Sequence, residues 1–258
     1  GYTIEVRTVD MYGQTFFGRR IVRVVTSEQL ATRERAKTSA AQESGLSLWQ
    51  GKSGRWTASQ NWSAAPAGRS VLLHGTAVVT LSKETTVNRF QLADGATLVI
   101  GKNGSLISTA QTNYVGSGYL GDANGGGHLK INDTGRLSTR FSISLGDRDA
   151  APGKLTLLGS SQASIGGGLY VGVRSDARIT MDNKTRCVVD GPVQLGWGAD
   201  LGFHPSSIVE MRGGLLEARS ITATRHCQPV FLFSGGNIVL SGDQRNLANQ
   251  EWFWTSRR

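Results

Sequence analysis

Apolar residues recur at every second position in short runs along the second half of the chain. Examples are Leu129-Lys130-Ile131, Leu155-Thr156-Leu157 and Ile179-Thr180-Met181, each closed within a few residues by glycine, asparagine, aspartate or serine. A period of two places both apolar side chains on one face of a β-strand. The closing residues adopt turn conformations at little cost. The pattern predicts many very short strands joined by tight turns.

A second pattern recurs at a longer interval. An apolar residue followed by glycine is found at Leu120-Gly121, Leu145-Gly146, Val171-Gly172 and Leu195-Gly196. These glycines are 25, 26 and 24 residues apart. A fixed interval of this size indicates repeat units that stack to bury a shared core, and it is too short for two full helices. We therefore expect an all-β fold, a right-handed parallel β-helix with about 25 residues per coil and about six coils between Leu98 and Leu240.

Composition divides the chain into three segments. Residues 1–25 alternate as two strands around a turn and resemble the end of a fibronectin III-like β-sandwich; the alternative is a flanking hairpin. Residues 26–44 are polar and alanine-rich without an apolar stripe, which favours a linker or short helix. Residues 45–258 hold the predicted solenoid. A β-sandwich needs more strands than residues 1–25 supply, so we expect this chain to be part of a longer multidomain protein.

Four motifs of the third segment resemble a known class of repeat proteins. They are WQGKSGRW at 49–56, NWS at 61–63, DGATLVIGKNGSL at 94–106 and FSGGNIVL at 233–240. They resemble the coils of large secreted and surface proteins of bacteria, of the autotransporter-passenger type and the planctomycete and verrucomicrobial type. The resemblance implies a pectin-lyase-like parallel β-helix in a secreted or cell-surface protein. It does not single out an activity.

Three tryptophans, Trp49, Trp56 and Trp62, precede the coils that the glycine pattern marks. The end of a solenoid exposes an unpaired strand edge and an open core, which large aromatic rings can cover. We therefore expect an aromatic cap. The alternative is a ligand-binding platform on which sugar rings stack.

The sharpest candidates for chemistry follow the repeated glycines. Asp122 and Asp147 stand one repeat apart, and Arg148 and Arg174 occupy the next position on their own coils. If the coils are in register, the two carboxylates stack, which raises one pKa or requires a cation. Paired acids beside arginine suit a polysaccharide lyase or glycoside hydrolase, and they equally suit calcium. The plainer interpretation is that both aspartates close turns and are neutralised by arginine.

The net charge of +9 first suggests nucleic acid. The lysines and arginines are scattered, however, without a basic helix or a basic-aromatic cluster, so we expect no nucleic-acid partner. An acidic polysaccharide or cell-surface glycan fits a basic β-solenoid better. No run approaches the length of a membrane helix, and the chain opens without a signal peptide.

The cysteines and histidines do not indicate a metal site or a definite disulfide. Cys187 and Cys227 do not coincide in the repeat frame, so a disulfide between them stays open beside two independent small residues. The histidines show no metal-ligand spacing, and we expect no cofactor apart from the calcium alternative. They are His74, His128, His204 and His226.

Together these patterns predict a structural or adhesive β-solenoid module that presents polar and basic side chains to glycans. The alternative is a polysaccharide lyase or glycoside hydrolase acting on an acidic polysaccharide. A phage tail-fibre segment shares the fold, and a trimeric state would favour it.

Overall fold

The computed structural model describes residues 2–9, 15–22, 45–117, 126–148, 151–197, 205–224 and 227–242. The chain forms two compact units, Gly1–Ala40 and Ala41–Arg258. In the first, β1 (Tyr2–Val9) and β2 (Thr15–Val22) pair antiparallel, where the alternation predicted two strands. Their assignment to a larger β-sandwich stays a prediction. The predicted linker or helix at 26–44 lies outside the described residues.

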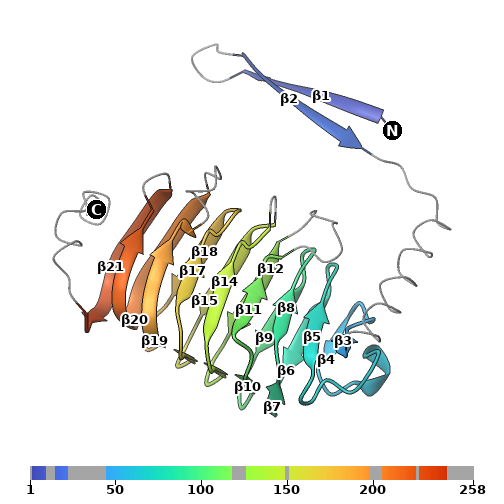
Figure 1. The fold of residues 1–258 in the computed structure, drawn as a ribbon, viewed down its shortest axis with the longest axis vertical. Coiled ribbons are helices and arrows are strands. Elements are labelled where there is room, and N and C mark those ends of the chain that lie inside the picture. Colours follow the sequence, from blue (N-terminus) through green and yellow to red (C-terminus); the bar gives the residue numbers. More distant parts are fainter. Residues whose placement is uncertain are drawn as a thin grey trace. The chain divides into compact units, whose positions relative to one another are not determined.

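The second unit is a parallel β-helix (Figure 1). Among the described residues, nineteen of its strands belong to one continuous hydrogen-bonded sheet. A strand typically pairs in parallel with the strands one coil before and one coil after it. For example, β10 (Ser105–Ser108) pairs with β7 (Glu84–Val87) and with β13 (Arg136–Thr139). The predicted all-β fold and its parallel coils are confirmed.

The strands collect into three faces along the coil. Face 1 contains β3 (Leu46–Leu48), β5 (Ser70–Leu73), β8 (Phe90–Leu92), β11 (Thr112–Val115), β14 (Ser142–Leu145), β17 (Leu169–Val171) and the ends of β19 (Arg186–Leu195) and β20 (Ser206–Ala223). Face 2 contains β4 (Ser53–Arg55), β6 (Val78–Leu81), β9 (Thr97–Ile100), β12 (Gly127–Ile131), β15 (Gly153–Leu157), β18 (Ala177–Met181) and the starts of β20 and β21 (Gln228–Leu240). Face 3 contains β7, β10, β13, β16 (Gln162–Ile165), the start of β19, the middle of β20 and the end of β21.

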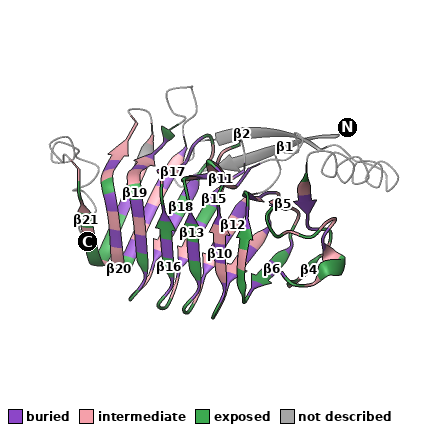
Figure 2. Ribbon diagram, turned by 60° about the horizontal axis from the view of Figure 1, so that its bottom comes forward, coloured by how far each residue is buried: buried purple, intermediate pink, exposed green. Residues whose placement is uncertain are grey.

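Inward side chains stack as ladders, so that buried residues alternate with more exposed ones along the strands of faces 2 and 3 (Figure 2). On face 1, β5 and β14 are buried over three successive residues. One ladder on face 2 runs through Val79, Leu98, Leu129, Leu155, Ile179, Val209 and Phe231, each at most 2% exposed. Burying one such side chain contributes about 1.5–3 kcal/mol. The rungs from Leu98 onward match the six predicted coils. The winding already begins at Leu46, ahead of the predicted first coil.

Glycine in the left-handed region marks the corner between faces 1 and 2. Gly116, Gly146, Gly172 and Gly196 have φ values of 76°, 69°, 72° and 69°. The register places Val115 beside Leu145, so Gly116 is the partner of Gly146, and the predicted repeat mark at Gly121 is wrong. Eleven residues separate the end of β11 at Val115 from the start of β12 at Gly127, and Leu120 and Gly121 among them lie outside the described residues.

Both cysteines are free. Cys187 lies in an inward ladder between Ala163 and Leu216, and complete burial raises the pKa of its thiol to about 12. Cys227 is half-buried, and burial raises the pKa of its thiol as well. Cys187 behaves as a small apolar residue, whereas the Cys227 thiol donates to the Ser207 hydroxyl and the Pro205 carbonyl. Two independent cysteines are one of the two alternatives that the sequence left open.

Candidate functional site

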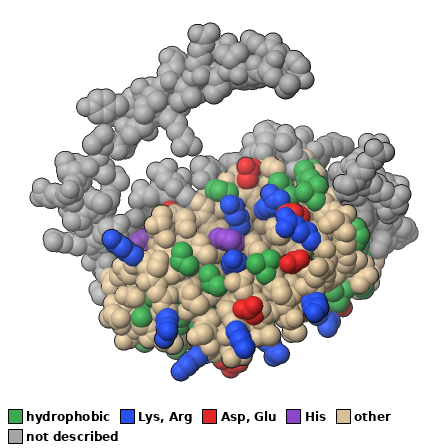
Figure 3. Space-filling model, turned by 180° about the vertical axis from the view of Figure 1, so that it is seen from behind, with side chains coloured by type: hydrophobic (Ala, Val, Ile, Leu, Met, Phe, Trp, Pro, Cys, Tyr) green, Lys and Arg blue, Asp and Glu red, His purple; other side chains and the backbone are tan. Residues whose placement is uncertain are grey.

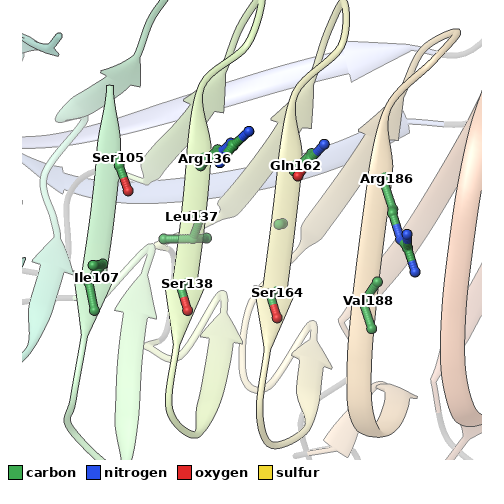
Figure 4. Close-up of a pocket in the computed structure, with 10 residues that line it drawn as sticks. Ser105, Ile107, Arg136, Leu137, Ser138, Gln162, Ser164, Arg186 and Val188 are labelled. Atoms are coloured by element: carbon green, nitrogen blue, oxygen red, sulfur yellow. The ribbon is translucent and has the colours of Figure 1, made fainter. Parts of the chain in front are cut away.

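Within the described residues, a groove on the outer surface of face 3 offers space for a ligand (Figure 4). It encloses about 430 Å³ and crosses β10, β13, β16 and β19, which belong to four successive coils. Its walls and floor are formed by Ser105, Ile107, Arg136, Leu137, Ser138, Gln162, Ala163, Ser164, Arg186 and Val188. Parallel strands lie ~4.8 Å apart, so the groove extends along the coil axis.

Two rows of outward side chains define this groove, as Figure 4 shows. The first row is Ser105, Arg136, Gln162 and Arg186, and the second is Ile107, Ser138, Ser164 and Val188. The strand period of two points both rows to solvent and leaves the residues between them in the core. The hollow arises because the two middle members of the second row are serines, whereas Ile107 and Val188 at its ends are larger.

The charge of the groove comes from two arginines. Arg136 and Arg186 stand in the same row with Gln162 between them. Arg186 donates a hydrogen bond to Glu217 at 3.2 Å, and both side chains of this pair remain exposed, at 55% and 39%. An exposed ion pair is weak, and guanidinium has five donors. Arg186 therefore keeps donors for a ligand.

The corner between faces 1 and 2 carries the residues that the sequence singled out for catalysis. Asp147 follows Gly146, and its backbone N–H donates to the carbonyl of Gly116. This register places Asp147 beside Ser117 of the preceding coil. Asp122 lies outside the described residues, so its pairing with Asp147 and the calcium alternative stay predictions.

Asp147 does have the predicted arginines near it. Partial burial raises the pKa of its carboxyl group, and the positive charges of Arg174 and Arg148 act in the opposite direction. Arg174 follows on the next coil, where its backbone N–H donates to the carbonyl of Gly146. Asp147 is therefore a carboxylate under the influence of two arginine charges. In the part of the chain that the structure describes, no three His, Cys, Asp or Glu side chains gather as a metal site.

The three N-terminal tryptophans form a cap. Trp49, Trp56 and Trp62 are 1%, 3% and 6% exposed. The Trp62 ring lies 5.0 Å from Trp49 and 4.7 Å from Trp56, both edge to face, and its indole N–H donates to the Trp56 carbonyl at 2.7 Å. The turn η1 (Ser59–Asn61) precedes Trp62. Buried rings offer no open surface for a sugar, so this geometry favours the cap over the platform.

A different aromatic pair is open to solvent. Trp197 is 50% exposed, and its ring lies 6.1 Å from that of Tyr170. Neither residue was predicted from the sequence as part of a site, because their segments were interpreted only as marks of the repeat. Trp197 follows Gly196 directly, which places it at the same corner as Asp147 and Arg174.

The groove itself was also missed from the sequence. Arg136, Gln162 and Arg186 are 26 and 24 residues apart, which is the interval of the coils. Aligning outward positions, as well as the glycines, would have placed them in one row. The expectation of scattered charge holds elsewhere: Figure 3 shows Lys and Arg spread over the face seen from behind, with fewer Asp and Glu.

On face 2 part of the basic charge is already neutralised. Glu210 accepts hydrogen bonds from Arg178 at 2.5 Å and from Arg212 at 2.7 Å. These bonds lower the pKa of the Glu210 carboxyl group. The Arg178 and Arg212 side chains stay 44% and 60% exposed, as Arg186 does. The groove is the stronger candidate for a ligand because its arginines border a hollow.

No family model, curated protein or solved structure matches this chain. The class of protein is therefore defined by the fold and the site together: a parallel β-helix with a basic groove along one face. Within the described ranges, no helix is both long enough and apolar enough to pass through a membrane.

Proposed function

We propose that this chain is a structural and adhesive β-solenoid module of a secreted or cell-surface bacterial protein, and that its groove on face 3 binds acidic polysaccharide. The observation that carries the proposal is the groove itself. It is open to solvent, lies across four coils and presents two arginines above small hydroxyl side chains.

The chemistry of the groove fits an acidic glycan. Arginine binds carboxylate through two parallel hydrogen bonds, and Ser138, Ser164 and Gln162 both donate and accept hydrogen bonds, as sugar hydroxyl groups require. The stacked coils fix the backbone positions of these residues before a ligand arrives, which lowers the ordering cost of binding. The motif resemblance to bacterial surface proteins supports the location.

The alternative function is a polysaccharide lyase or hydrolase. The observation that favours it is Asp147, whose carboxyl pKa is raised by burial while Arg174 and Arg148 lie nearby. A raised pKa suits a group that must exchange protons. The same geometry also suits an aspartate that closes a turn.

The test is affinity electrophoresis in native gels cast with acidic or neutral polysaccharides and then stained for polymer loss. We expect acidic polymers to retard the protein without clearing of the gel. The paired variant Arg136→Gln/Arg186→Gln should lose most of that retardation. Arg178→Gln removes one similar charge from face 2 and should keep it.

Three results would contradict the proposal. One is an absence of retardation by every polymer, and another is equal retardation of the paired groove variant. The third is clearing of the gel by the wild type and not by Asp147→Asn, which would establish the enzyme.

A further inference from the structure

The two arginines of the groove lie two coils apart in a single row. Arg136 pairs with Gln162, and Gln162 pairs with Arg186, as direct Cα partners on neighbouring strands. Each step between parallel strands is ~4.8 Å, so the two arginine backbones stand ~9.6 Å apart along the coil axis. The backbone spacing is fixed by the ladder, because a strand cannot slip by one residue without turning its core side chains outward.

The position between the arginines is neutral and polar. Gln162 offers an amide that both donates and accepts, and Ser138 and Ser164 line the second row beside it. The row therefore alternates cation, neutral group and cation. An anion opposite Gln162 has no cation directly facing it, whereas a hydroxyl group there can form a hydrogen bond with the Gln162 amide.

Acidic residues lie beside both ends of the groove. Glu84 is the partner of Ser105 in the first row. Glu217 is the partner of Val188 in the second row, and its carboxylate contacts Arg186. The Glu84 carboxylate repels an anionic ligand beyond Ser105, whereas the charge of Glu217 is offset by Arg186. The groove is thus suited to a short segment of a polymer, of about one sugar ring per coil.

We propose that the groove recognises an extended polyanion whose carboxylates recur on one side at twice the coil spacing, as in a chain of equatorially linked uronic acids with two-fold symmetry. In such a chain one ring advances about as far as one coil, and alternate rings present their carboxylates to the same side. The carboxylates facing the groove then meet Arg136 and Arg186, and the intervening ring presents hydroxyl groups to Gln162. This inference rests on the proposed function and adds the linkage and the charge spacing of the ligand.

The decisive variant moves one charge without changing the composition. Arg136→Gln combined with Gln162→Arg keeps two arginines and the same net charge, but places them on adjacent coils. Isothermal titration calorimetry would measure the affinity of this variant and of the wild type for oligomannuronate (equatorial linkages) and for oligogalacturonate (axial linkages) of equal length. Both oligomers carry one carboxylate per ring, so charge density is matched.

We expect the wild type to bind oligomannuronate about tenfold more tightly than oligogalacturonate, and the swapped variant to lose about tenfold for oligomannuronate. Gln162→Arg alone adds a charge and should not raise the affinity for oligomannuronate. These substitutions are on an outward row, and circular dichroism confirms that each variant is folded.

The outcomes separate the two claims. If acidic polymers retard the wild type but the swapped variant binds oligomannuronate equally well, the spacing inference is overturned and the proposed function stands. A gain in affinity for Gln162→Arg would overturn it too, because charge number alone would then set binding. If the wild type binds neither oligomer and no polymer retards it, both claims fail.

Discussion

The single residues that matter most to the coil are its corner glycines. Gly146 has a φ of 69°, which L-residues with a side chain rarely adopt. A Cβ added there would also lie 2.4 Å from the carbonyl oxygen of Ser175 on the next coil. Gly75 has a similar φ of 68°, yet a Cβ there would meet nothing within 4 Å. The two positions separate backbone strain from steric conflict between coils.

We expect Gly146→Ala to lower the free energy of unfolding by more than about 2 kcal/mol, because it combines both costs. Gly75→Ala should cost only about 1 kcal/mol, from the backbone alone. Denaturant unfolding followed by circular dichroism measures both variants. Equal losses would show that the close approach at Gly146 is relieved by a small shift of the chain.

The protonation of His128 makes the free energy of unfolding depend on pH. His128 is half-buried on face 2, and its Nε2 lies 2.9 Å from the Thr156 hydroxyl. Burial lowers the pKa of the imidazole below 6.5, with further lowering by the positive charges of Lys154 and Lys130. Folding therefore favours the neutral ring. Stability is lost as the pH falls below 6.5, where the unfolded chain takes up a proton and the folded chain does not.

We expect the melting temperature to fall between pH 6.5 and the lower folded-state pKa, and to fall less in His128→Gln. Glutamine keeps a polar side chain beside Thr156 without titrating. Thermal unfolding at a series of pH values provides the comparison. Parallel curves for the two proteins would show that other groups cause the pH dependence.

At the scale of elements, the aromatic cap closes the N-terminal end of the core. Trp49, Trp56 and Trp62 pack against one another beside β3 and β4, and their rings belong to the same buried cluster as the ladders. The three rings cover the first coil. The Trp62 indole N–H donates a hydrogen bond to the Trp56 carbonyl, which links two of them. Their role is stability, because a terminal coil needs a cover that the inner coils give to each other.

Replacing Trp62 by alanine should cost about 3–5 kcal/mol of stability, as expected for a buried tryptophan, and leave retardation by polysaccharide unchanged. The matched control is Trp197→Ala, where the side chain is 50% exposed and stability should change little. Chemical denaturation and native gels measure the two properties separately. Lost binding with unchanged stability in Trp62→Ala would restore the sugar-binding platform.

Strands were easier to predict than the corners between them. Alternation at Leu129, Leu155 and Ile179 identifies strands because each must fill a ladder with an apolar side chain. Corners carry no such constraint: the connections between faces 1 and 2 vary in length from four residues at 93–96 to eleven between Val115 and Gly127. This variation is the physical reason that the repeat mark was placed at Gly121 instead of Gly116.

At the scale of the whole molecule, the fold followed from one repeated unit, whereas the groove did not. The groove depends on side chains from four coils at once, and its hollow exists because Ser138 and Ser164 are small where Ile107 and Val188 are not. No single segment contains that information. The register that aligns the segments had to be known first, and the arginine row then follows from it.

The central claim is that acidic polysaccharide binds the groove on face 3, and an NMR titration of the whole chain with oligomannuronate tests it most directly. We expect changes in the amide chemical shifts of Ser138, Gln162 and Ser164, together with changes in the guanidinium signals of Arg136 and Arg186, while the signals of His128 and Lys154 on face 2 stay unchanged. Changes centred on face 2, or on the Trp197 corner with the groove unaffected, would contradict it.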